Sequence, residues 1–197
     1  MGGTVKEKLD HLSPIYQGFA AETSAFHGNA ACSKGCAFCC TKAGSIDITT
    51  LEGLHIQNTL SRLLRARRIQ IKKALAREMK KREAGSIVPC PFLQKNHTCM
   101  IYSARPFACR RIYSLHHCSE QNPPRLSRQY MTLAQETLNQ LQLLDEHGYS
   151  GHISYILHLL EMPQFRETYL AGEYKPEEIL AYGKSHRLVM NKVAAGK

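Results

Sequence analysis

Apolar residues at intervals of three and four positions indicate helices over most of the chain. This spacing predicts a helix from residue 6 to about 27, with Pro14 either beginning it or interrupting it. After Pro124 the same pattern predicts four more helices, over residues 126–147, 153–160, 163–171 and 176–193. We therefore expect a mainly α fold.

The longest apolar stripe lies in the middle of the chain. Thr49 and Glu52 have the spacing of a capping box, in which the two side chains satisfy the first-turn amides, so Glu52 is interpreted as a cap rather than a catalytic base. From residue 54 to 84 no proline or glycine interrupts the helical pattern. The pattern predicts one long central helix.

Two segments lack helical periodicity. Residues 28–45 and 86–124 contain all the cysteines, and the second of them is rich in prolines and polar turns. We expect residues 1–197 to form a single domain, in which these segments make an irregular cysteine-rich metal-binding lobe and residues 125–197 add C-terminal helices. A loop-built lobe has little apolar core, and bound metal would supply the missing cross-links.

Composition is typical of a soluble globular protein of the cytoplasm. The 197 residues are 43% hydrophobic without a long apolar run, and the N-terminus lacks the apolar core of a secretory signal. We expect no membrane insertion and reduced thiols, which makes eight cysteines more typical of metal ligands or redox groups than of disulfides. An exported, disulfide-bonded protein is the alternative.

The net charge of +10 is concentrated in one segment. Between Arg62 and Arg82 there are ten basic residues and one acidic residue, Glu78, which gives +9. The segment is interpreted as a solvated helix face, with an acidic protein or a nucleic acid such as RNA as the alternative partner. No aromatic residue occurs between these positions, so stacking platforms for single-stranded bases are absent there.

The cysteines carry the clearest chemistry. Cys36 and Cys39 form a C-x2-C pair, a spacing that lets two thiolates reach one ion. Adjacent Cys39 and Cys40 would project in different directions, so they serve different roles in one site or two neighbouring metals. The candidate metal ligands are Cys32, Cys36, Cys39, Cys40, Cys90, Cys99, Cys109 and Cys118.

Separated motifs in a fixed order make residues 32–118 resemble a known family. In sequence they are C-x3-C-x2-C-C from Cys32, Ile48-Thr49-x2-Glu52, Cys90-Pro91-Phe92-Leu93, Cys99-Met100-Ile101-Tyr102 and Arg105-Pro106-x2-Cys109-Arg110. They resemble the cysteine-cluster family of zinc- or iron-chelating proteins. The resemblance implies that all eight cysteines belong to one metal-binding unit. Its members include proteins labelled iron-sulfur oxidoreductases and a flagellin lysine methylase, so the reaction stays open.

The metal also stays open. Two closed four-thiolate zinc sites would use eight ligands without chemistry, whereas iron, including an iron-sulfur cluster, would make the same residues a redox or Lewis-acid centre. His116 and His117 are either replacement ligands beside Cys118 or solvated loop residues. The candidate functions are metal binding, an iron-dependent oxidoreductase or protein-modifying enzyme, and a metal-stabilised polyanion- or RNA-binding module.

Cationic and aromatic residues accompany the cysteines. Arg105, Arg110 and Arg111 either offset the charge of a thiolate cluster or serve in a turn and in carboxylate pairs. Tyr102 and Tyr113 are interpreted as core residues of the lobe, with donation to the cluster as the alternative.

Overall fold

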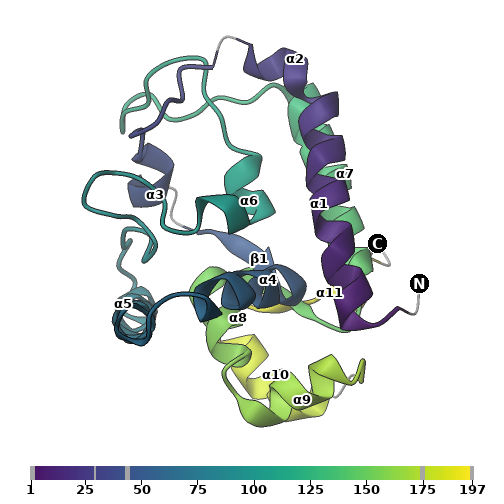
Figure 1. Cartoon of the computed structure of the whole chain (residues 1–197). Helices are drawn as coiled ribbons and strands as arrows, with labels where there is room; N and C mark the ends of the chain where they lie inside the picture. The colour runs from purple at the N-terminus through teal and green to yellow at the C-terminus, as the bar shows by residue number, and fades with distance from the viewer. Residues whose placement is uncertain (1–2, 29, 43–44, 174–175, 196–197) are drawn as a thin grey trace.

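The computed structural model of the protein describes residues 3–28, 30–42, 45–173 and 176–195. Helices surround a small three-stranded sheet (Figure 1). The predominance of helices confirms the expected mainly α fold. The elements in chain order are α1 (Val5–Glu22), α2 (Ser24–His27), α3 (Phe38–Lys42), β1 (Asp47–Thr49), α4 (Thr50–Ser61), α5 (Arg65–Glu83), the 3-10 helix η1 (Tyr102–Ala104), α6 (Phe107–Arg110), α7 (Arg128–Leu144), β2 (Tyr149–His152), α8 (Ile153–Leu159), α9 (Pro163–Leu170), α10 (Pro176–Ser185), β3 (Val189–Met190) and α11 (Asn191–Ala195).

The sheet joins distant parts of the sequence. Its strand order is β1-β2-β3, and both pairs are antiparallel, with Ile48 opposite Gly151 and Tyr149 opposite Met190. A Cβ at Gly151 would lie 2.3 Å from the Cδ2 of Leu188, so only glycine fits there without a shift. The sequence pattern did not predict β2 or β3, because both strands are too short for alternation to be read.

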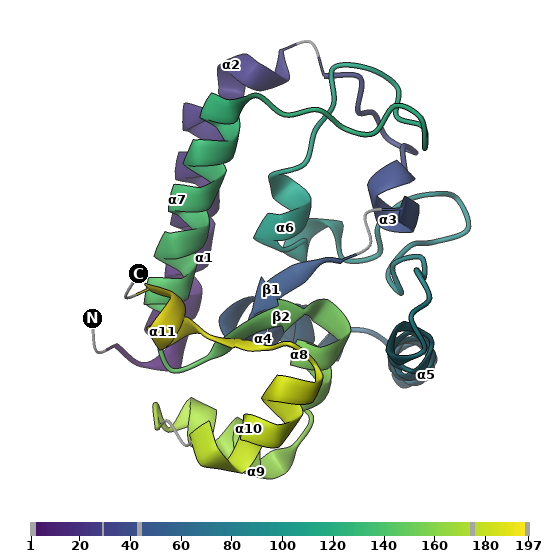
Figure 2. The ribbon, with the colours of Figure 1, turned by 180° about the vertical axis from the view of Figure 1, so that it is seen from behind.

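Two hydrophobic clusters hold the helices. Helices α1 and α7 lie side by side along one edge of the molecule in both views (Figures 1 and 2), and the rings of Phe19, Phe107 and Tyr130 join them to α6. A second cluster joins α4, α5 and α8, with Ile56 and Ile156 fully buried in it. The loops with the cysteines are supported by both clusters.

Three predicted helices have different limits. The N-terminal helix divides at Thr23, and Pro14 lies inside α1. The helix predicted over 176–193 ends at Ser185, and the chain then enters β3. The predicted long central helix, expected to begin at the capping box of Thr49 and to continue without a break through residues 54–84, is corrected to two helices, α4 and α5, with an extended backbone at Leu64 between them.

Packing explains the division of the central helix. Leu54 on α4 and Leu75 on α5 belong to the same hydrophobic cluster. A straight helix over these 31 positions would be about 46 Å long and would carry Leu75 away from that cluster. The turn brings the apolar faces of α4 and α5 onto α8. No glycine or proline at the turn indicates this break in the sequence.

No helix within the described ranges is both long enough and apolar enough to cross a bilayer.

Candidate metal centre

The two cysteine-rich segments contact each other at one end of the molecule. Helix α3 lies beside the loops between α5 and α7 in both views (Figures 1 and 2). The N–H of Cys90 donates to the carbonyl of Cys40 at 2.7 Å, and the N–H of Ala31 donates to that of Ser114, also at 2.7 Å. Lys42 and Glu120 form an ion pair between the same segments. Residues 29, 43 and 44 of the first segment lie outside the described residues.

Local turns position the first four thiols. Gly35 has a φ of 94°, a conformation that suits glycine, and the N–H of Cys36 donates to the carbonyl of Ser33 at 3.0 Å to close the turn. Cys39 and Cys40 follow on α3. Successive residues on a helix point about 100° apart, so these neighbours face different surroundings.

A short hairpin-like loop positions Cys90 and Cys99. Leu93 and Cys99 form an isolated antiparallel bridge, and the N–H of Met100 donates to the carbonyl of Phe92 at 2.9 Å. The Phe92 ring is fully buried, which anchors the loop to the core. Cys90 and Cys99 pack against the same core, so their sulfurs are fixed by hydrophobic contacts as well as by the backbone.

Electrostatic contacts define a first group of thiols. We name it the first cysteine set: Cys32, Cys36, Cys39 and Cys118. Burial is the main cause that raises the pKa of Cys39 to about 12, and the Cys118 and Cys32 thiols add to it. Burial also raises the pKa of Cys32, against a hydrogen bond from the backbone of Ser114, and Cys36 and Cys118 add to it. As thiolates, Cys32 and Cys39 would therefore each be repelled by Cys36 and Cys118, and Cys39 also by its neighbour Cys40.

The remaining thiols form a second group. We name it the second cysteine set: Cys40, Cys90, Cys99 and Cys109. Burial raises the pKa of Cys109 far above its usual range, and the other three thiols of the set add to it. Burial likewise raises the pKa of Cys90 to about 12, against a hydrogen bond from the backbone of Phe92. The sets meet at α3, where Cys40 also interacts with Cys36 and Cys39.

Backbone amides face several of these sulfurs. Hydrogen bonds from the backbone of Phe92 and Ile101 lower the pKa of Cys90 and Cys99, although burial outweighs them and leaves both values raised. Each amide lies two residues beyond the cysteine that it contacts. Amides turned toward sulfur stabilise thiolates, the form that binds metal.

The donor chemistry fits zinc or iron. All eight cysteines are free thiols; Cys32 and Cys36 are exposed and the others are partly buried. Four sulfurs per set match the ligand number of a tetrahedral thiolate site or of an iron-sulfur cluster. As they stand, no three His, Cys, Asp or Glu side chains among the described residues have a geometry that could hold a metal ion. The sulfurs would have to close in on binding.

The neighbouring arginines have distinct roles. Arg105 opposes the burial that raises the pKa of Cys99, and its guanidinium lies 4.3 Å from the ring centre of Tyr102. The guanidinium of Arg110 lies at the same distance from the Tyr16 ring, and its Nε donates to the carbonyl of Arg105 at 2.8 Å. Arg105 and Arg110 can both offset thiolate charge, because Arg105 interacts electrostatically with Cys99 and Arg110 with Cys109. Arg110 also holds the backbone of the turn.

The aromatic and histidine candidates lie in different environments. Tyr113 is buried beside Tyr130 in the core, as interpreted from the sequence, whereas Tyr102 is 62% exposed and is not a core residue. His116 lies with its Nε2 3.2 Å from the carbonyl oxygen of Pro123, and His117 is exposed.

Beside the second cysteine set is a small open pocket with room for little more than a water molecule, and its lining includes Cys39, Cys40 and Cys90. Glu78 of α5 also lines it: its Oε1 accepts a bond from Arg82 Nε at 2.7 Å, and its buried Oε2 has no hydrogen-bond partner. His152 of β2 also lines the pocket, and its Nε2 lies 3.7 Å from Glu78 Oε1. Burial lowers the pKa of His152 to about 4, so the ring is neutral at pH 7.

Sequence reasoning missed Glu78 and His152 as site residues. They lie on α5 and β2, 74 positions apart, and only the fold brings them to the cysteines. The available signal was that Glu78 is the one acidic residue in the basic run between Arg62 and Arg82. A lone carboxylate in such a run can be an inward-facing residue.

Glu52 confirms its interpretation as a cap and does more. Its Oε2 accepts the N–H of Thr49 at 2.9 Å, which completes the capping box of α4. Its Oε1 accepts both the Tyr16 hydroxyl at 2.8 Å and the N–H of Phe107 at 2.7 Å. One buried carboxylate therefore joins α1, α4 and α6, and it holds the segment that carries Cys109.

Comparison with known proteins agrees with this chemistry. No curated protein and no solved structure matches the chain. The family model CxxCxxCC, described as a "Putative zinc- or iron-chelating domain", matches residues 31–137, more than half of the chain. This match contains all eight cysteines, and the chain belongs to the CxxCxxCC family.

Proposed function

We propose that the protein binds metal at two neighbouring centres, one held by each cysteine set. The observation that supports this proposal is that the two cysteine-rich segments meet at α3, where the N–H of Cys90 bonds the carbonyl of Cys40. The electrostatic interactions among the thiols fall mainly within the two sets. The chelating description of the family supports the same chemistry. Zinc and iron are the candidate metals, including iron in an iron-sulfur cluster.

The residues of each set would act as thiolate ligands. In the first set Cys118 would join the three thiols of the N-terminal segment, and in the second set Cys40 would join the three thiols of the loop region. Each centre would thereby cross-link segments that are far apart in sequence, which stabilises loops without an extensive core. Bound metal would supply Lewis-acid chemistry, and iron would add redox chemistry.

The test is to prepare the full chain without oxygen and to measure its metals, its acid-labile sulfide and its absorption spectrum. Two zinc ions per chain in colourless protein would support two four-thiolate zinc centres. Brown protein with iron and sulfide would support clusters. Protein without stoichiometric metal, or with disulfides in fresh material, would overturn the proposal.

A reaction at the second centre is a second candidate function. The pocket beside Cys40 and Cys90 favours it, because Glu78 and His152 line the same space as candidate acid and base groups. A water molecule in this pocket would meet both the cysteines and a carboxylate oxygen that lacks a partner. The chemistry would fit an iron-dependent oxidoreductase or a protein-modifying enzyme, the alternatives that the sequence leaves open.

Cobalt substitution tests whether the second centre accepts an outside ligand. Co²⁺ in the full chain should change its visible absorption when azide or imidazole is added, and Cys118→Ser, which leaves the second set intact, should keep this response. An unchanged spectrum would indicate closed four-thiolate centres and would remove this candidate while leaving metal binding in place.

A further inference from the structure

Helix α5 presents a continuous positive surface. We name as its basic face the exposed residues Arg65, Arg67, Arg68, Lys72, Lys73, Arg77, Lys80 and Lys81. The helix lies at an edge of the molecule, where Figures 1 and 2 both view it end-on. The surface is therefore accessible from outside.

The arrangement of residues around α5 explains why this face points outward. At about 100° per residue, the buried Ile71, Leu75 and Glu78 form one narrow stripe. That stripe packs into the hydrophobic cluster with α8 and against the pocket. The residues of the basic face are spread around the rest of the helix circumference, over a length of about 28 Å. The exposed uncharged residues Ala66, Ile69, Gln70 and Ala76 lie among them.

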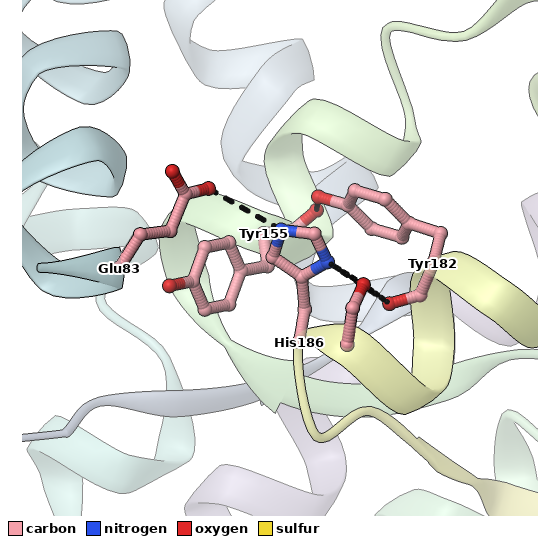
Figure 3. A network of polar contacts seen from close by, with 5 residues as sticks. Glu83, Tyr155, Tyr182 and His186 are labelled. Carbon is pink, nitrogen blue, oxygen red and sulfur yellow. Dashed lines mark hydrogen bonds and ion pairs between the residues drawn. The ribbon is translucent and has the colours of Figure 1, made fainter.

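The acidic residues of α5 do not neutralise this face. Glu78 is buried and bonded to Arg82. Glu83 turns toward His186, whose Nε2 lies 3.3 Å from the carboxylate oxygen (Figure 3). The His186 ring is itself held by the Tyr182 and Tyr155 rings, with centroids 4.1 Å and 4.5 Å away. On the basic face, Lys72 forms an ion pair with Glu161 at 2.9 Å.

We propose that the basic face of α5 binds the phosphate backbone of a double-stranded nucleic acid. One strand of a duplex presents a phosphate every 3.4 Å of axis, so a helix of this length can face about eight phosphates. The cations recur along the helix from residue 65 to residue 81 rather than at one point, which suits a row of phosphates. This proposal does not depend on the identity of the metal.

The composition of the face favours a duplex over other polyanions. Stable protein interfaces have an apolar, often aromatic centre, and α5 contains no aromatic residue. Single strands are bound mainly by stacking of bases on aromatic rings, which the face also lacks. Phosphate contacts by Lys and Arg require neither feature.

Fluorescence anisotropy with 20-base-pair DNA and RNA duplexes tests the proposal on metal-loaded full chain. Five phosphate contacts would give a slope of about −4.5 in the logarithm of the association constant against that of salt concentration, or roughly a 500-fold loss between 50 and 200 mM salt. Binding of both duplexes would show that the protein recognises the phosphate backbone of either helical form. Binding of one duplex alone would show that it recognises the backbone of that form.

A matched pair of variants separates the face from the total charge. Changing Arg65, Arg68, Lys73, Lys80 and Lys81 to Gln lowers the formal charge from +10 to +5. Changing Lys6, Arg125, Arg128, Lys184 and Lys192, which are exposed elsewhere, to Gln does the same. The first variant should lose at least about tenfold in affinity and most of the salt slope, while the second keeps both.

Three results would overturn the proposal. Equal loss in the two variants would indicate attraction by net charge alone. Competition by poly-glutamate as strong as that by duplex would indicate an acidic protein partner instead. Tight binding by the α5 variant, with unchanged circular dichroism, would show that the duplex binds elsewhere.

Discussion

Serine in place of Cys118 should remove metal from the first cysteine set alone. Cys118 interacts electrostatically with Cys39 and Cys32, whereas Cys109 interacts electrostatically with the thiols of the second set. We expect Cys118→Ser and Cys109→Ser each to lose about half of the bound metal, and the double variant to lose nearly all. Elemental analysis of anaerobic protein measures this. Complete loss in either single variant would point to one shared centre of eight ligands.

Metal uptake should release protons. Burial raises the pKa of Cys39 and of Cys90 to about 12, so these thiols are protonated at pH 7 in the metal-free protein. Metal binds the thiolate, and each ligand gives up its proton on binding. Calorimetry in buffers of different ionisation enthalpy should detect about four protons per centre, and affinity should fall as pH decreases. Uptake without proton release would contradict thiolate ligation.

At the scale of residues, the candidate ligands could be named from the sequence, whereas the residues that surround them could not. Motif order identified the cysteines, and spacing identified Glu52 as a cap. The division into sets depends on contacts such as that between the N–H of Cys90 and the carbonyl of Cys40, which arise only when distant segments meet. Glu78 and His152 were missed for the same reason.

Glutamine in place of Glu52 should loosen three elements at once. Oε1 of Glu52 faces the donors of Tyr16 and Phe107, and Oε2 faces the N–H of Thr49, so an amide NH₂ would meet a donor in either orientation. We expect a loss of roughly 2–4 kcal/mol in unfolding free energy. Urea denaturation measures it.

The capping box of α1 supplies the control for Glu52. Glu7 accepts the N–H of Thr4 at 2.7 Å on the exposed N-terminus. Glu7→Gln should cost less than about 1 kcal/mol, because water can replace the lost bond. Similar losses in the two variants would mean that Glu52 is only a cap.

At the scale of elements, apolar periodicity predicted which segments are helical but not where one helix ends and the next begins. The residues between Ser61 and Arg65 include no glycine or proline, yet α4 ends and α5 begins there. The gain is tertiary, because the turn returns Ile71 and Leu75 to the cluster that holds Leu54. Periodicity reports which face is apolar and not where that face is buried.

Asp145 should make the stability of the whole molecule depend on pH. Its carboxylate is buried between elements and accepts bonds from the N–H of Leu51, the Tyr169 hydroxyl and the Asn191 amide. Burial raises its pKa to about 7 from 3.8. The folded state therefore binds the Asp145 proton more tightly than the unfolded chain does, and this difference contributes to the free energy of unfolding. The contribution is complete below about pH 4 and is lost as pH rises through 7.

Unfolding free energies at pH 5 and pH 8 test this dependence. The loss on going to pH 8 should be on the order of 2 kcal/mol smaller in Asp145→Asn than in the unmodified chain. Tyr169→Phe removes the hydrogen bond to Asp145 but leaves its carboxyl group ionisable. This variant should therefore show the full loss of unfolding free energy between pH 5 and pH 8. An unchanged pH dependence in Asp145→Asn would show that the group does not titrate in this range.

Because β2 lies late in the sequence, its pairing with β1 can form only after the cysteine-rich segments have been synthesised. All eight cysteines are made before Tyr149, yet His152 and Ile153 line the pocket beside the second cysteine set. In a nascent chain that lacks β2 and α8, the second cysteine set is therefore not yet covered by His152 and Ile153. Ribosome-bound chains in which residue 145 has just left the exit tunnel should leave the second set open to thiol-labelling reagents, and chains long enough for α8 to emerge from the tunnel should protect it. Loading of the second centre would then wait for the C-terminal third of the chain.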